Sequence, residues 1–337
     1  MTTFGLLVLV VVAALVFDFI NGFHDTANAI ATVVSTGVMR TRTAVIMAAV
    51  LNIVGAFMGT AVASTIGKDL VDPAHVTQQL VLAALLSAIS WNLITWWFGI
   101  PSSSSHALVG GLIGAGISAL GVGAIKAEGV EKVVTALVVS PILGFVVSFF
   151  LMVAMYWVVR RSRPTKINRL FKRLQIFSAG FMALSHGSND AQKTMGVITM
   201  ALVSYQGTYD PAAKFPVPTW VVLACALAMG LGTASGGWRI IKTMGSKIFK
   251  LRPIHGFCAE TGAATLLQLA SHFGLPVSTT HVITSAIMGA GATTRLSAVS
   301  WGVTQRILVA WVLTIPVCIA LGTGFYELFG YIGLLPA

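Results

Sequence analysis

Long apolar stretches alternate with short polar stretches along the whole chain, and their lengths predict membrane-spanning helices. Apolar segments fall at residues 4–39, 43–66, 78–98, 102–121 and 133–159, and a second set falls at 174–206, 219–237, 254–272, 277–292 and 301–325. About 20 apolar residues suffice for one helical crossing of a bilayer. We therefore expect an all-α, polytopic membrane protein with two sets of about five membrane segments each.

The composition agrees with a membrane protein. Of the 337 residues, 56% are hydrophobic and only 9% are charged, whereas soluble domains carry about 25% charged residues. A net charge of +11 would suggest a nucleic-acid partner for a soluble protein, but basic residues in membrane proteins mark cytoplasmic loops. We therefore expect a lipid bilayer and no nucleic acid as the partner. The run from Phe4 to Phe17 lacks a basic start and a cleavage site, which favours a retained helix over a signal peptide.

The loop charges predict an orientation. If each segment crosses once and the chain starts outside, most of the 21 basic residues fall in inner loops, including seven between Arg160 and Arg173. The acidic residues outside the apolar segments fall in the outer loops. The positive-inside rule then predicts a multi-pass protein of the cell (plasma) membrane with cytoplasmic basic loops and both termini outside.

An odd number of crossings per half makes the second half enter from the opposite side. We expect a transmembrane repeat 1 at 1–159, a basic cytoplasmic linker at 160–173 and an inverted transmembrane repeat 2 at 174–337. Inverted repeats around a midplane site are common in secondary transporters. Non-helical backbone at membrane depth must line a cavity or be buried in protein. The segments therefore include broken helices or re-entrant hairpins at the midplane, and the sequence leaves open which.

Two aspartates lie in matched polar motifs inside apolar segments. The motifs read Asn21-Gly22-Phe23-His24-Asp25-Thr26-Ala27-Asn28 and His186-Gly187-Ser188-Asn189-Asp190-Ala191-Gln192-Lys193. A charge within the membrane is costly and indicates a functional site. Carboxylate and amide oxygens suit a small cation or a proton. The candidates for cation or proton coupling are Asp25, Asn28, Asp190, Asn21, Asn189 and Lys193; a structural hydrogen-bond network is the alternative.

Each motif is followed by a hydroxyl-rich break after a proline. The breaks read Pro101-Ser-Ser-Ser-Ser-His106 and Pro276-Val-Ser-Thr-Thr-His281. Hydroxyls cap helix N-termini, and the free N–H groups and dipole of an N-terminus bind oxyanions. Two such breaks can hold one tetrahedral anion, although capping alone would also explain them. The candidates for phosphate binding are Ser103, Ser104, Ser105, Ser278, Thr279 and Thr280.

At these residues the chain resembles the inorganic phosphate transporter (Pit/PiT) family, whose bacterial members are low-affinity phosphate permeases. The family motif G-A-N-D-x-x-N-A is matched by Gly22-Phe-His-Asp25-Thr-Ala-Asn28-Ala29 and by Gly187-Ser-Asn-Asp190-Ala-Gln-Lys193-Thr194. The resemblance implies secondary active symport of inorganic phosphate with sodium or protons by alternating access, with no cofactor and no enzymatic activity. It also implies phosphate at the hairpin hydroxyls and cations near the motif aspartates and Asn28.

Lys193 departs from the motif, because it stands where the family pattern has Asn. An ammonium one helical turn from Asp190 can pair with it and occupy the place of a sodium ion. This departure favours protons over sodium as the coupling ion. The resemblance also implies a divalent metal–phosphate complex, such as one with Mg²⁺, as a form of the substrate. His24 and His186 are candidate metal ligands or proton relays.

Other functions remain as alternatives. A sodium-coupled phosphate symporter and a sulfate permease of the same fold would use the same motifs. An intramembrane hydrolase could be drawn from Ser105, His106 and Asp25, but adjacent helical residues do not face each other. The sequence is also compatible with a homodimer, and it assigns no role to Glu260.

Overall fold

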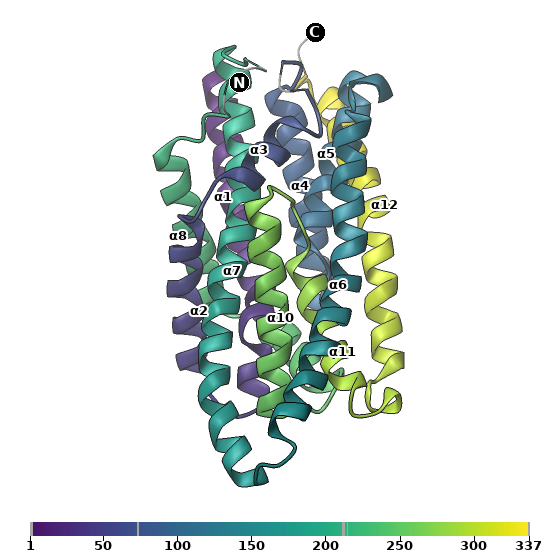
Figure 1. Cartoon of the computed structure of the whole chain (residues 1–337). Coiled ribbons are helices and arrows are strands. Elements are labelled where there is room, and N and C mark those ends of the chain that lie inside the picture. The colour runs from purple at the N-terminus through teal and green to yellow at the C-terminus, as the bar shows by residue number, and fades with distance from the viewer. Residues whose placement is uncertain (1–2, 73, 211–212, 214, 336–337) are drawn as a thin grey trace.

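The computed structural model is a bundle of long helices whose axes run in roughly one direction (Figure 1). It describes residues 3–72, 74–210, 213 and 215–335. The helices are α1 (Thr3–Ser35), α2 (Thr41–Ala56), α3 (Ala61–Lys68), α4 (Gln78–Phe98), α5 (Ser104–Leu120), η1 (Val122–Ala124), α6 (Ala127–Val159), α7 (Pro164–Gln206), α8 (Thr219–Ser235), α9 (Trp238–Lys242), η2 (Thr243–Lys247), α10 (Pro253–His272), α11 (Thr279–Ala292), η3 (Leu296–Ala298) and α12 (Trp301–Tyr331). Because these residues form no named strand, the expected all-α class is confirmed.

Several helices are built to cross a membrane. Within the described ranges, α1, α4, α6 and α12 are long and apolar enough to do so singly. Two further candidate spans are bent pairs: α2 and α3 meet at 71°, and α8 meets the α9–η2 segment at 61°. The 43-residue α7 is about 65 Å long and runs the length of the bundle (Figure 1). The fold is that of a multi-pass membrane protein, as the apolar segments predict.

Two helix pairs form hairpins that approach the middle of the bundle from opposite ends. Hairpin 1 is α4 and α5, and it lies toward the end that carries α1's start and α12's end (Figure 1). Hairpin 2 is α10 and α11, and it lies toward the end where α6 connects to α7. The first arm of each hairpin is followed by a left-handed glycine, Gly99 with φ 65° and Gly274 with φ 66°. Both pairs therefore turn back within the bundle, with their connecting segments 99–103 and 273–278 between the two arms.

The helix boundaries differ from the apolar pattern in two places. Of the range 160–173 expected as a linker, only residues 160–163 lie between helices, because α7 begins at Pro164. Proline suits the first helical position since its missing N–H has no intrahelical partner there, and the Lys, Arg and Leu residues that follow are good helix formers. The segment 43–66, expected as one span, is interrupted at 57–60 between α2 and α3.

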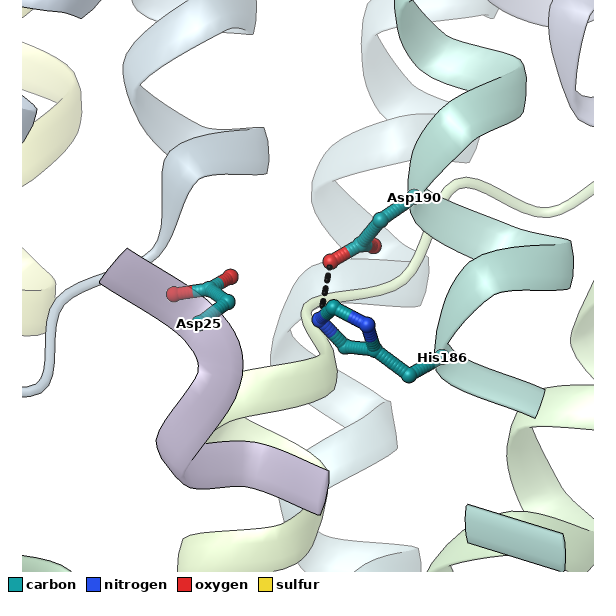
Figure 2. A group of neighbouring side chains, drawn as sticks. All are labelled: Asp25, His186 and Asp190. Carbon is teal, nitrogen blue, oxygen red and sulfur yellow. Dashed lines mark ion pairs between the residues drawn. The ribbon is translucent and has the colours of Figure 1, made fainter. Parts of the chain in front are cut away.

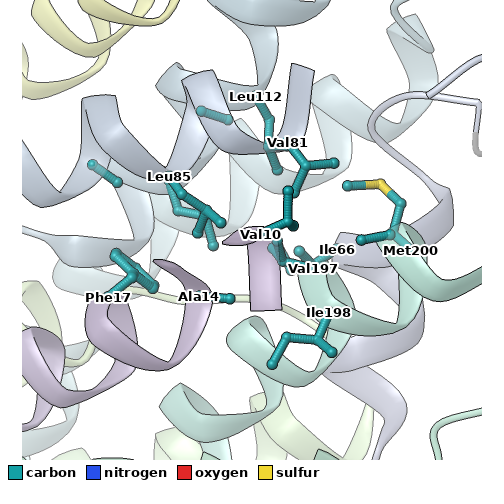
Figure 3. Packing of buried hydrophobic residues seen from close by; sticks show 14 of the residues in the cluster. Val10, Ala14, Phe17, Ile66, Val81, Leu85, Leu112, Val197, Ile198 and Met200 are labelled. Atoms are coloured by element: carbon teal, nitrogen blue, oxygen red, sulfur yellow. The ribbon is translucent and has the colours of Figure 1, made fainter. Parts of the chain in front are cut away.

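Of two apolar clusters among the described residues, one surrounds the first half of α1 and the other packs against its second half. Val10, Ala14 and Phe17 of α1 are buried against side chains of α3, α4, α5 and α7 (Figure 3). Glycines allow the closest helix contacts: a Cβ on Gly55 of α2 would clash with the backbone of α7, and one on Gly187 of α7 would clash with the backbone of α2. This close packing fixes the height of the second aspartate motif, which begins one residue before Gly187.

Candidate functional site

The two aspartate motifs meet in the middle of the bundle. Asp25 comes from α1, and Asp190 and His186 come from α7, with their polar ends directed toward one another (Figure 2). Ligand atoms of these three residues lie within 4.8 Å of one another. Asp25 is 2% exposed and Asp190 is 1% exposed. Two motifs 165 positions apart in sequence therefore contribute to one buried site.

Asp190 is held by an ammonium, an imidazole and a hydroxyl. Lys193 pairs with its Oδ1, and His186 Nε2 lies 3.1 Å from its Oδ2. Thr279 of hairpin 2 donates a hydrogen bond to Oδ2 at 2.9 Å. Lys193 Nζ also donates to Ser105 Oγ at 2.6 Å and to the Val277 carbonyl at 3.0 Å. An ammonium has three N–H donors, so the protein uses all of them, on α7 and on the tips of both hairpins.

Asp25 has a different set of partners. His24 Nδ1 lies 2.6 Å from Asp25 Oδ1, and Thr280 donates to the same oxygen at 3.4 Å. Asn28 Nδ2 donates to Thr279 at 3.2 Å and to Thr280 at 2.9 Å. Within the described residues no Lys or Arg forms an ion pair with Asp25, whereas Lys193 does so with Asp190. The two motifs are therefore related in sequence but unequal in charge.

The hydroxyl-rich breaks place two helix N-termini at the site. Ser103 accepts from the His106 N–H at 3.1 Å and Ser278 accepts from the His281 N–H at 3.3 Å, so both are N-caps as expected. Ser104 is 3% exposed, and its hydroxyl has no hydrogen-bond partner among the described residues. The N-termini of α5 and α11, with the unused Ser104 hydroxyl at the first residue of α5, suit an oxyanion.

A chain of polar residues outside the motifs orients the two histidines. His24 Nε2 lies 3.1 Å from Thr95 Oγ1, which accepts from Ser102 at 2.8 Å. Asn52 of α2 donates through Nδ2 to Thr233 at 2.8 Å, so its Oδ1 is an acceptor, and that oxygen lies 3.1 Å from His186 Nδ1. Ser102 belongs to the first hydroxyl-rich break, whereas the sequence analysis missed Thr95, Asn52 and Thr233. Their one signal was an isolated polar residue within an apolar segment.

Two of the expected coupling residues, Asn189 and Asn21, form no hydrogen bond to an aspartate among the described residues. Asn189 Nδ2 donates to Ser271 of α10 at 3.0 Å, so it braces hairpin 2 rather than an aspartate. Asn21 is buried, and its Oδ1 has no hydrogen-bond partner within the described part of the chain. The remaining expected residues lie together at the hairpin tips and the aspartates.

The buried Glu260 of α10, to which the sequence assigned no role, lies in a network of its own. Gln175 of α7 donates to its Oε1 at 3.0 Å. Thr32 of α1 also donates to Oε1, and Ser178 of α7 donates to Oε2. Glu260 therefore ties hairpin 2 to both motif-bearing helices.

The residues considered for a hydrolase do not form a catalytic triad. Ser105 Oγ accepts from Lys193 and lies 3.4 Å from the Val277 carbonyl. The His106 ring packs against the His281 ring with centroids 4.3 Å apart, and neither of its nitrogens has a hydrogen-bond partner in the described ranges. No base therefore faces the Ser105 hydroxyl from His106.

Comparison with known proteins shows to which family the chain belongs. Residues 21–322 match the model of the phosphate transporter family. The chain belongs to this family. It is a phosphate transporter and not an enzyme, as the motifs predicted.

Its relatives in the phosphate transporter family cover nearly the whole chain. A protein of Bacillus subtilis (strain 168) named "Probable low-affinity inorganic phosphate transporter" is 50% identical over 329 residues, which cover 97% of this chain and 98% of the relative. A protein of the same name from Mycobacterium tuberculosis (strain ATCC 25618 / H37Rv) is 47% identical, covering 98% and 79% respectively. A solved structure titled "The sodium-dependent phosphate transporter" has a TM-score of 0.87 at 26% identity and covers 97% of this chain and 100% of that one.

Proposed function

We propose that this phosphate transporter imports phosphate by proton-coupled symport, with alternating access of the single central site. One observation supports a bound proton or other cation at this site. His186 Nδ1 faces the acceptor oxygen of Asn52 and so carries a hydrogen, yet Nε2 of the same ring lies 3.1 Å from the Asp190 carboxylate. A lone pair facing a carboxylate at this distance is repulsive, so a proton or another cation belongs between them.

The position of Lys193 favours protons over sodium as the coupling ion. Its ammonium occupies Asp190 Oδ1 and a carbonyl of hairpin 2, which are the oxygen ligands that a sodium ion would otherwise use. The solved relative is sodium-dependent by title, so sodium coupling is the alternative. The departure at Lys193 is the reason to expect a different coupling ion here. The protons would then move on Asp25, Asp190 and the two neighbouring histidines.

The phosphate would bind between the two hairpin tips, at the hydroxyls of Ser104, Ser105, Thr279 and Thr280, with Ser103 and Ser278 capping the helices behind them. The N-termini of α5 and α11 would both face the phosphate, and the positive end of a helix dipole favours an anion. The opposite placement of the hairpins supports two inverted repeats. By the positive-inside rule the end with the α6–α7 connection would face the cytoplasm and both termini the outside of the plasma membrane; a homodimer is compatible with this arrangement.

A divalent metal–phosphate complex is the second candidate substrate. Asp25, His186 and Asp190 offer one ligand atom each within 4.8 Å of one another. Two carboxylates and an imidazole can bind a divalent ion, and the imidazole favours a transition metal over Mg²⁺. A metal there would also satisfy the unpaired His186 Nε2.

Uptake by the purified protein in proteoliposomes tests both proposals. An inward proton gradient without sodium is expected to drive accumulation of labelled phosphate, and adding sodium should change nothing. Repeating the assay with a chelator and then with Mg²⁺ or Mn²⁺ separates free phosphate from its metal complex. Accumulation that needs a sodium gradient and ignores protons would refute the coupling proposal, and excess sulfate that competes equally would refute phosphate selectivity.

A further inference from the structure

Two threonines outside the site hold the turns of the two hairpins in the same way. Thr65 Oγ1 of α3 donates to the carbonyl of Gly274 at 2.7 Å. Thr243 Oγ1 of η2 donates to the carbonyl of Gly99 at 2.9 Å. Each glycine follows the first arm of its hairpin in the left-handed conformation. Both threonines are buried, at 4% and 7% exposure, so each hydrogen bond is shielded from water.

The two contacts match beyond the hydrogen bond. The residue four positions before each threonine packs its backbone on the same glycine: a Cβ on Gly274 would lie 3.1 Å from the Ala61 carbonyl oxygen, and one on Gly99 would lie 3.4 Å from that of Arg239. Ala61 and Arg239 are as far apart in the chain as Thr65 and Thr243. The same local structure therefore occurs twice, which a chance contact between a loop and a helix would not produce.

Each contact joins one half of the chain to the hairpin of the other half. Thr65 lies just after the 71° bend between α2 and α3 but holds hairpin 2, and Thr243 lies just after the 61° bend at the end of α8 but holds hairpin 1. A short segment beyond a break can move without its long helix, as hinge-linked elements do. The α3 contact reaches the tip of hairpin 2 from the end with the termini. The η2 contact is made by the segment between the end of α8 and the start of α10, and α10 starts at the end of the α6–α7 connection.

The glycine turns lead directly into the phosphate cradle, the name used here for the proposed phosphate-binding hydroxyls of Ser104, Ser105, Thr279 and Thr280. Gly99 precedes Ser103 by four residues, and Gly274 precedes Ser278 by four. Holding the glycine carbonyl therefore fixes where the capping serine and the hydroxyls after it lie. Both contacts are formed here, and Asp25, Asp190 and Ser104 are all buried. The site is closed toward both ends of the bundle.

We propose that Thr65 and Thr243 are positioning residues that each close one access route to the site. The Thr65–Gly274 bond closes the route from the end with the termini, and the Thr243–Gly99 bond closes the route from the opposite end. Transport then requires release of one bond at a time. This proposal rests on the alternating access proposed above, but it can fail independently, because it concerns which end opens rather than which ion or anion passes.

A reporter cysteine tests the sidedness. Ser104→Cys places a thiol in the cradle, and a membrane-impermeant thiol reagent is added to either face of sealed vesicles in the absence of phosphate. Thr65→Val is expected to raise labelling about tenfold from the face with the termini alone, and Thr243→Val about tenfold from the other face alone. Tenfold corresponds to about 1.4 kcal/mol, which is the upper end of the usual net contribution of one hydrogen bond. Cys225, Cys258 and Cys318 are buried, and the protein without the reporter gives their background.

Three controls make the result decisive. Thr65→Ser and Thr243→Ser keep the hydroxyl and should restore protection. Thr199→Val removes a buried hydroxyl that has no hydrogen-bond partner in the described residues and should leave labelling unchanged; alanine replaces valine where a valine variant does not fold. Labelling that stays at the parent rate, or that rises equally from both faces, overturns the proposal. One-sided labelling in a protein that does not couple phosphate to protons would leave this proposal standing and refute the proposed coupling alone.

Discussion

Replacing Lys193 by Asn, which restores the family motif in the second half, should make the protein respond to sodium. The change removes the ammonium from Asp190, Ser105 and the Val277 carbonyl. It puts an amide oxygen in the place of that ammonium, one turn from the carboxylate. A sodium ion can then take the position that Lys193 fills in the wild type, as carboxylate and amide oxygens suit a small hard cation.

The expected magnitude follows from the burial of the pair. Lys193 and Asp190 have side chains 3% and 2% exposed, and removing one member of a buried ion pair costs about 3–5 kcal/mol because the other charge stays buried. Sodium at about 100 times its dissociation constant would return about 2.7 kcal/mol. The Lys193→Asn protein should therefore be markedly destabilised without sodium and should regain more than half of the lost stability with it.

The assay is thermal unfolding of the detergent-solubilised protein in sodium chloride against choline chloride at equal ionic strength, followed by uptake with an imposed sodium gradient. Lys193→Met is the matched control, since it keeps the length of the side chain but supplies neither charge nor an oxygen ligand. It should be destabilised and remain indifferent to sodium. Equal sodium stabilisation of the wild type and Lys193→Asn, or none in either, would show that Lys193 does not occupy a cation position.

Other changes separate the roles within the site. Asp25→Asn should abolish proton-driven uptake while phosphate exchange across the membrane persists; normal accumulation in this variant would contradict a coupling role. Ser104→Ala should raise the phosphate concentration for half-maximal uptake with unchanged stability, whereas Ser103→Ala should cost about 1 kcal/mol of stability because it removes a cap; equal effects on unfolding would contradict the assignment. Glu260→Ala leaves three buried donors unpaired at about 1–3 kcal/mol each, so unfolding should shift strongly; a silent substitution would mean that the network is not formed.

The sequence predicted the family and pointed to residues that meet in the middle of the bundle, but it did not predict how they contact one another. The paired motifs with Asp25 and Asp190 identified the family, and the prolines identified the breaks, because charged and helix-breaking residues are rare in apolar segments for physical reasons. The approach of the two helix pairs to the middle of the bundle depends on contacts between distant helices, which local composition does not encode. The same holds for Thr65 and Thr243, which look like ordinary residues until the fold brings their hydroxyls to Gly274 and Gly99.

The attachment of the Lys193 ammonium to the chain has an electrical consequence. A sodium ion bound at Asp190 would be left on the inner side, so its charge would cross the membrane once per cycle. The Lys193 ammonium cannot leave. Any part of the membrane voltage that it crosses in the inward direction it crosses back when the empty carrier reorients. One elementary charge moved through 100 mV corresponds to about 2.3 kcal/mol, and this contribution cancels over a full cycle for a tethered charge. In the proposed cycle the voltage therefore acts on accumulation only through the net charge of the protons and the phosphate that are released together.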